Sequence, residues 1–207
     1  MKYKHIVFDV DGTLLDSEQA VLQSMQDVLF EVTGRKFPFE ELTFALGITG
    51  ADALERLQIE DIPIVLHRWE VILHEYADMQ GVYAGIEQLL RVLSEGGCSL
   101  GIATSRKRVA YDHDFARFDI SRYFSVVICA DDTKTHKPTA GPLLKYMELT
   151  GADRGEVLYI GDSVYDSKCA ENAGVDFALA VWGSHTQTTK AAYYLHEPME
   201  LMRYMDE

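Results

Sequence analysis

The stretch Asp9-Val10-Asp11-Gly12-Thr13-Leu14 follows the short apolar run His5-Ile6-Val7-Phe8 near the start of the 207-residue chain. An apolar run without alternation is typical of a strand that is buried on both faces of a sheet. The two aspartates lie two positions apart, so they project to the same side while the chain stays extended. Gly12 allows a sharp turn and a close approach of the backbone to a ligand. The stretch therefore predicts a buried strand that ends in two convergent carboxylates.

Further apolar runs along the chain end in polar loops in the same way. They cover residues 99–103, 125–129, 157–160 and 177–181. Helical patterns separate these runs, for example Ile86, Leu89, Leu90 and Leu93 before the first of them. Strands that alternate with helices indicate an α/β fold with a parallel, doubly wound sheet.

One interval, between the first apolar run and Ser99, is too long for this alternation. A βαβ unit needs about 30 residues, and this interval is about three times as long. Its content is helical, since Ser17 can cap a helix that Gly34 ends and Pro63 can begin another. We expect an α-helical cap over residues 18–80, inserted into a Rossmann-like core of residues 1–17 and 81–207.

Polar residues stand at or just beyond the carboxyl ends of the expected strands, where open parallel sheets bind their ligands. These residues are Asp9, Asp11, Thr104, Ser105, Lys137, Asp162 and Asp166. Several carboxylates in one pocket raise one another's pKa and require a compensating cation. Carboxylate oxygens without soft ligands point to Mg²⁺ as that cation.

Four motifs in this order resemble those of the haloacid dehalogenase (HAD) superfamily. Residues 9–13 read DxDGT, Thr104 follows a hydrophobic strand, Lys137 stands in His-Lys-Pro, and residues 161–166 read GDxxxD. The resemblance covers essentially the whole chain and is closest to the phosphoglycolate phosphatase-like branch. It implies a phosphatase with an α/β core and a helical cap that acts through an aspartyl-phosphate.

The resemblance also implies a catalytic role for each matching residue. Asp9 would be the nucleophile, because covalent catalysis splits one difficult step into two. Asp11 would be the general acid and base. Thr104 would donate its hydroxyl to the transferring phosphoryl group, and Lys137 would neutralise the charge that develops there.

The resemblance implies a metal site and a phosphate site at the same place. Mg²⁺ would be held by the side chains of Asp9 and Asp162 and the backbone carbonyl of Asp11, with Asp166 in a supporting position. The phosphate-binding residues would be Gly12, Thr13, Thr104, Ser105 and Lys137. In this set Thr13 would orient Asp11, while Gly12 and the backbone near Ser105 would contribute N–H groups.

Residues beside the motifs carry further expectations. We expect Ser17 to cap the first cap helix and the basic run 106–108 to be partly solvated. His67 and His74 lie seven positions apart and are expected on a solvated helix face. Neither stands in an HExxH motif, so we expect no zinc site in the cap. The loop 46–50, with glycines at both 47 and 50, is read equally as a substrate loop and as a plain turn.

Two positions depart from the pattern of the HAD family. The family's KPxP reads Lys137-Pro138-Thr139-Ala140 here, and Ala84 replaces the usual proline before the glycine at the end of the cap. Neither change removes a catalytic group.

Two other functions stay open beside the phosphatase. A phosphomutase of the β-phosphoglucomutase type shares the same core and cap. A signalling module whose aspartate is phosphorylated without turnover fits the large insertion poorly.

Composition limits the partners. The chain holds 19 basic and 33 acidic residues, with a formal net charge of −14, which argues against nucleic acid and anionic membranes. No signal peptide and no apolar run of membrane-spanning length are visible, so we expect a cytoplasmic protein. The expected partner is a small phosphorylated metabolite. The resemblance implies phosphoglycolate, while nucleoside monophosphates, sugar phosphates and pyrophosphate stay open as substrates. The composition leaves the oligomeric state open.

Overall fold

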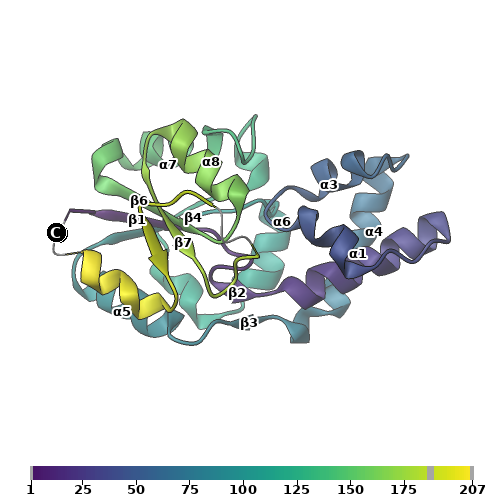
Figure 1. Ribbon diagram of the computed structural model, residues 1–207, viewed down its shortest axis with the longest axis horizontal. Helices are drawn as coiled ribbons and strands as arrows, with labels where there is room; N and C mark the ends of the chain where they lie inside the picture. The colour runs from purple at the N-terminus through teal and green to yellow at the C-terminus, as the bar shows by residue number, and fades with distance from the viewer. Residues whose placement is uncertain (1, 186–188, 206–207) are drawn as a thin grey trace.

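A parallel six-stranded sheet forms the centre of the computed structural model, which describes residues 2–185 and 189–205 (Figure 1). Its strands are β1 (His5–Phe8), β4 (Ser99–Ala103), β5 (Val126–Ile128), β6 (Val157–Gly161), β7 (Asp176–Ala180) and β8 (Tyr193–Leu195). Their order in the sheet is β5-β4-β1-β6-β7-β8, and all neighbouring pairs are parallel. The predicted α/β class with a doubly wound parallel sheet is confirmed.

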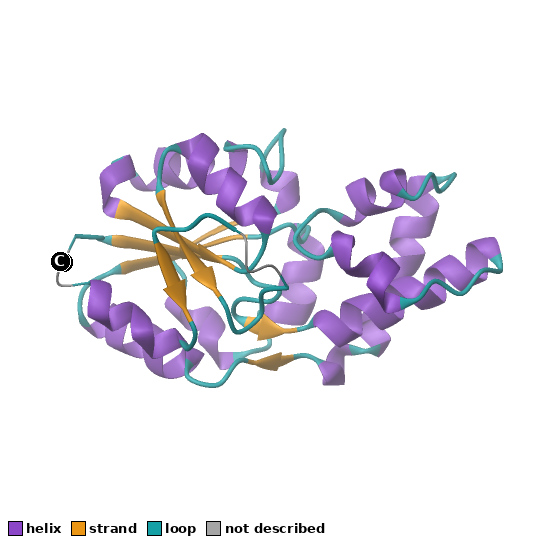
Figure 2. Cartoon of the chain, viewed as in Figure 1, coloured by secondary structure: helices purple, strands orange, loops and turns teal. Residues whose placement is uncertain are grey.

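The apolar runs form strands because helices cover both faces of the sheet (Figure 2). Ile6 and Phe8 of β1 pack on the side of α5 (Ile86–Glu95). Val7, which points the opposite way, packs on the side of α7 (Gly141–Thr150) and α8 (Val164–Ala173). Successive residues of a strand therefore meet different hydrophobic layers, and none of the three can be polar without a buried partner.

The strand order reverses at β1, which lies between β4 and β6. The chain moves from β1 outward to β4 and β5, and then returns to the other side of β1 to form β6. Open α/β sheets bind ligands outside the carboxyl ends of the strands at such a point. Phe8 pairs with Ile160, so the residues that follow β1 and β6 emerge next to each other.

The sequence prediction missed three short strands. β8 follows the gap in the described residues and adds to the edge of the sheet beside β7. β2 (Leu15–Asp16) and β3 (Gly81–Val82) form a separate antiparallel pair. β2 and β3 have two residues each and are too short to show a hydrophobic period.

Helices α1 to α4 form a separate group that projects from one end of the sheet (Figure 1). They are α1 (Glu18–Thr33), α2 (Phe39–Leu42), α3 (Gly50–Arg56) and α4 (Ile62–Glu75), with a 3₁₀ turn η1 (Thr43–Ala45) after α2 and another, η2 (Ala77–Met79), after α4. Gly34 ends α1 in the left-handed conformation, and Pro63 lies in the first turn of α4, as the sequence predicts. Met25, Leu54 and Trp69 belong to a hydrophobic cluster of this group alone.

We keep the division into a cap, residues 18–80, and a core, residues 1–17 and 81–207, as a proposal. The separate hydrophobic cluster supports it, and so does the pairing of β2 with β3, which brings the two chain connections side by side.

The remaining helical segments are short and lie in the core. They are α6 (Arg108–Ala110), the π-helical turn η3 (Tyr111–Phe115), η4 (Asp119–Tyr123), η5 (Ala130–Asp132), η6 (Arg154–Glu156) and η7 (Pro198–Tyr204). None of the helices in the described ranges has both the length and the apolar character that a bilayer crossing needs.

Candidate active site

The adjacent ends of β1 and β6 bring two aspartates together. Asp9 is the first residue after β1, and its backbone N–H donates to the carbonyl oxygen of Ile160 at 2.9 Å. Asp162 is the first residue after β6. Both are buried, with 2% and 6% of their surface exposed. Parallel register at the strand ends thus places two carboxylates in an interior where each costs free energy unless it is compensated.

Asp166 adds a third buried carboxylate from the first turn of α8. One oxygen from each of Asp9, Asp162 and Asp166 lies within 4.8 Å of the others. Burial raises the pKa of Asp9 to about 7, with a partial opposing effect from Lys137. Burial, reinforced by the charges of Asp166 and Asp9, raises the pKa of Asp162 well above its usual range. A donor set of carboxylate oxygens under such repulsion fits a hard divalent cation such as Mg²⁺.

Lys137 supplies positive charge to the same cluster from the loop before α7. Its Nζ lies 2.9 Å from Oδ1 of Asp9 and 2.7 Å from Oδ1 of Asp166, and its side chain is 1% exposed. Burial lowers the pKa of Lys137, but the charges of Asp166 and Asp9 outweigh it and hold the pKa above its usual value. Lys137 therefore stays charged beside Asp9.

Both oxygens of Asp166 are occupied by donors from the protein. Oδ1 is within hydrogen-bond distance of Lys137 Nζ and of the Tyr159 hydroxyl, at 2.7 and 2.8 Å. Oδ2 accepts from the backbone N–H and from the hydroxyl of Ser163. Asp166 is thus placed to hold Lys137 in position. Sequence reasoning missed Tyr159, since it stands inside an apolar strand run and reads as a core residue.

The turn after Asp11 packs against Asp162. Gly12 adopts a positive φ of 76°, and a Cβ there would lie 2.5 Å from Oδ2 of Asp162. The hydroxyl of Thr13 donates to Oδ1 of Asp162 at 3.1 Å. The expectation that Thr13 orients Asp11 is therefore wrong in this structure, because Thr13 orients Asp162.

Asp11 is held by Arg106, the first residue of the basic run that the sequence predicts to be partly solvated. Arg106 donates from Nε to Oδ2 of Asp11 at 2.8 Å and from Nη2 to Oδ1 at 2.5 Å. Burial raises the pKa of Asp11, but Arg106 and the Ser17 hydroxyl outweigh it, so the pKa lies below its usual value. Arg106 is only 8% exposed, so the expectation of a partly solvated side chain is wrong at this position.

Ser17 also differs from its expected role. It precedes α1, but its side chain makes no capping hydrogen bond. Its hydroxyl donates instead to Oδ1 of Asp11 at 2.5 Å. The carboxylate competes successfully with the backbone for this hydroxyl because a charged acceptor forms the stronger hydrogen bond.

Thr104 and Ser105 follow β4 and face the same region. Thr104 is 2% exposed, and its Oγ1 accepts the backbone N–H of Arg106 at 3.2 Å. The Ser105 hydroxyl donates to the carbonyl oxygen of Gly47 at 3.0 Å. This bond joins the loop 46–50 of the helical group to the core beside the candidate site.

A cavity of about 250 Å³ opens beside Asp9 and Asp11. All residues of the loop 46–50 line it, which places that loop at the site. The apolar lining is Val21, Ala45, Leu46, Ile48, Ala51, Leu66, Trp69, Leu73, Ala110 and Ala130. The cavity therefore has charged residues at the strand ends on one side and an apolar wall on the other, and most of that wall comes from the helical group.

Comparisons with known proteins agree with this geometry. The model of the family described as "Haloacid dehalogenase-like hydrolase" matches residues 6–180. A protein from Caldanaerobacter subterraneus subsp. tengcongensis described as "Putative pyrophosphatase PpaX" is 28% identical, covering 98% of this chain and 94% of its own. The crystal structure of a "putative phosphoglycolate phosphatase" from Lactobacillus plantarum has a TM-score of 0.91 at 30% identity, covering 98% of this chain and 99% of its own. A HAD-superfamily hydrolase of subfamily IA from Geobacter sulfurreducens has a TM-score of 0.77 at 26% identity, covering 98% and 100%.

Proposed function

The chain belongs to the haloacid dehalogenase-like hydrolase family and is a phosphoric ester hydrolase, and from this premise we propose a finer function. It is a Mg²⁺-dependent phosphatase that hydrolyses a small phosphomonoester through an aspartyl-phosphate on Asp9. One observation carries the proposal, namely the convergence of Asp9, Asp162 and Asp166 around Lys137 at the strand-order reversal.

The first step uses Asp9 as the nucleophile. An oxygen of its carboxylate attacks phosphorus, the bond from phosphorus to the ester oxygen breaks, and Asp11 gives that oxygen a proton. In the second step Asp11 takes a proton from water as the water oxygen attacks phosphorus, and the bond to Asp9 breaks to release phosphate. Lys137 and Thr104 stabilise the negative charge of the transferring group.

The carboxylates of Asp9 and Asp162 and the backbone carbonyl of Asp11 would hold Mg²⁺, which supplies positive charge to the phosphoryl oxygens when it is bound. Asp166 supports this arrangement by fixing Lys137, since both of its oxygens accept hydrogen bonds from protein groups.

The ion pair with Arg106 bears on the two roles of Asp11. Arg106 favours the charged carboxylate of Asp11, so in this conformation Asp11 can accept the proton of water in the second step. The acid step requires a weaker ion pair. Arg106 also lines the cavity, so a phosphoryl group there offers the guanidinium a competing anionic partner and frees Asp11 to hold a proton.

The cavity wall favours a substrate with a compact apolar body. The phosphoryl group itself competes for Arg106, and the other cation of the lining, Lys107, is paired with Glu70 at 3.0 Å. A second charged group, as in pyrophosphate or phosphoglycolate, would lose hydration against an aliphatic wall without gaining a free cation. His136 lines the cavity, and its Nδ1 is buried without a hydrogen-bond partner in the described part of the chain, so it can bind one polar group of the substrate.

A substrate panel tests this choice. We expect kcat/KM for an aryl or short alkyl phosphate with Mg²⁺ to exceed that for phosphoglycolate and for pyrophosphate by at least about tenfold, equivalent to about 1.4 kcal/mol. A preference for pyrophosphate would overturn the substrate proposal and leave the role of Asp9 intact. Isomerisation of a sugar phosphate, primed by a bisphosphate and without phosphate release, would favour the phosphomutase alternative.

A substitution at the nucleophile tests the reaction itself. Asp9→Asn should abolish turnover of any phosphomonoester in the panel, since an amide does not attack phosphorus. Asp153→Asn is the matched control, because Asp153 is exposed in the segment that leads into β6, at the opposite end of that strand from Asp162. Retained turnover in Asp9→Asn, or an equal loss in the control, would contradict the proposal. Rapid phosphate release by the isolated wild-type protein would exclude the signalling module.

A further inference from the structure

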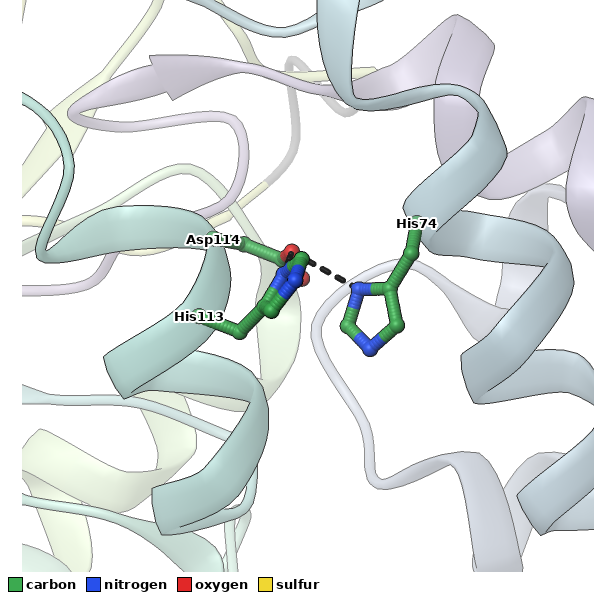
Figure 3. Close-up of side chains that lie close together, drawn as sticks. All are labelled: His74, His113 and Asp114. Atoms are coloured by element: carbon green, nitrogen blue, oxygen red, sulfur yellow. Dashed lines mark hydrogen bonds and ion pairs between the residues drawn. The ribbon is translucent and has the colours of Figure 1, made fainter.

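Two histidines and an aspartate, none of them a member of the acidic cluster, meet where the helical group touches the core (Figure 3). His74 lies in the last turn of α4, and His113 and Asp114 lie in η3. The sequence placed His74 on a solvated face with His67. That expectation holds for His67, whose side chain is 80% exposed, but His74 is 29% exposed and contacts the core.

Three potential ligand atoms converge at this contact. Nδ1 of His74 and Nδ1 of His113 lie 2.9 and 2.8 Å from the same oxygen, Oδ1 of Asp114. The two imidazole rings are 3.9 Å apart between centroids and tilted by 44°. One ligand atom from each residue lies within 4.8 Å of the other two.

The backbone of η3 helps to create this convergence. Neighbouring residues of an α-helix point in directions too different for their side chains to meet. His113 and Asp114 lie in the π-helical turn Tyr111–Phe115, and their side chains contact each other there. Such turns are rare and are found frequently at functional sites.

The donor set differs in chemistry from the acidic cluster. Two imidazole nitrogens and one carboxylate oxygen suit Zn²⁺ and similar ions, whereas Mg²⁺ prefers oxygen ligands alone. Zn²⁺ with three protein ligands takes water as the fourth. The exposed side of the cluster leaves room for that water, since the side chain of His113 is 58% exposed while that of Asp114 is completely buried.

The carboxylate is already held in the orientation that a metal ligand needs. Nη1 of Arg106 donates to Oδ2 of Asp114 at 3.2 Å, which leaves Oδ1 for the two histidines. The charge of Arg106 is offset by its ion pair with Asp11. Partners of this kind orient metal ligands in known sites and are themselves important for affinity.

We propose that His74, His113 and Asp114 form a binding site for a Zn²⁺-class ion that joins α4 to the core. Binding uses Nδ1 of each ring, so the proton of each neutral imidazole then resides on Nε2. The ion would fix α4, whose Trp69 and Leu73 line the cavity, and would slow the cap motion that substrate entry and product release require. The site does not depend on the proposed phosphatase reaction.

The full-length protein, freed of metal with a chelator and supplied with excess Mg²⁺, allows a direct test. We expect Co²⁺ to produce visible absorption bands of a tetrahedral site with nitrogen ligands, and Zn²⁺ to displace it. His74→Gln and His113→Gln should each weaken Zn²⁺ binding, measured by calorimetry, by at least about tenfold. His67→Gln is the matched control on the same helix and should bind as the wild type does.

Activity assays provide a second measurement. Added Zn²⁺ should lower kcat in the wild type and in His67→Gln, with less effect in His74→Gln. Co²⁺ bands and Zn²⁺ affinity that are unchanged in folded His74→Gln and His113→Gln would overturn the proposal, as would the absence of Zn²⁺ binding in the wild type. If His74→Gln does not fold, the outcome rests on His113→Gln, because His113 is more exposed.

Discussion

Removal of the metal should make stability fall as pH rises, because Asp9 is buried among like charges. Its pKa is about 7 in the folded protein and 3.8 ordinarily, so the folded state binds this proton more tightly than the unfolded state. The stabilisation from that proton is complete below the ordinary pKa and is lost as pH rises through about 7. Between pH 6 and pH 8, Asp9 alone should cost about 1.4 kcal/mol of the free energy of unfolding.

Urea unfolding of the chelator-treated protein at pH 6 and pH 8 measures this loss, and the same experiment with Mg²⁺ measures its reversal. Mg²⁺ binds the charged carboxylates, so it should stabilise the protein more at pH 8 than at pH 6. Other groups also titrate in this range, and Asp9→Asn serves as the reference without the Asp9 proton. A wild type that loses no more stability than Asp9→Asn does between pH 6 and pH 8 would refute the predicted role of Asp9.

Three further substitutions test individual contacts. Lys137→Met leaves buried carboxylates without their cation and should lower the free energy of unfolding at pH 8 by about 3–5 kcal/mol in urea. Arg106→Gln should raise the pKa of Asp11 and shift the alkaline limb of the plot of kcat/KM against pH to higher pH, by at least about one unit. An unchanged pH profile would argue against Asp11 as the general acid. Gly12→Ala places a Cβ 2.5 Å from Asp162 at a positive φ, so Mg²⁺ titration should show weaker binding, and unaltered affinity would mean that the turn does not position this carboxylate.

The sheet could be predicted because its signal is local. Each inner strand is buried on both faces and therefore appears as a continuous apolar run, and each run ends at the residue where the strand ends or close to it. The edge strand β8 has only three residues, Tyr193–Leu195, and one of its side chains is exposed, so its burial is not continuous as in the inner strands.

The residues at the strand ends could be named from the sequence, but their partners could not. Asp9, Asp162 and Lys137 follow recognisable motifs, and the parallel sheet brings their positions together. Arg106 stands in a run of three basic residues, and nothing in that run indicates which side chain turns inward. Arg106 turns inward because it pairs with Asp11, which is 95 positions away in the sequence.

The contact between α4 and η3 shows the same limit. His74 and Asp114 are separated by 40 positions, and the π-helical turn that presents Asp114 has no sequence signature. The seven-residue spacing of His67 and His74 describes one helix correctly, but it contains no information about the element that the helix meets.

The central claim is that Asp9 becomes phosphorylated during turnover. Rapid-quench analysis with a substrate labelled in its phosphate, followed by peptide mapping, tests it most directly. We expect an acid-stable, hydroxylamine-sensitive phosphoryl group on the peptide that contains Asp9, formed within one turnover and absent in Asp9→Asn. Turnover by the wild type without label on Asp9, or with label on another residue, would contradict it.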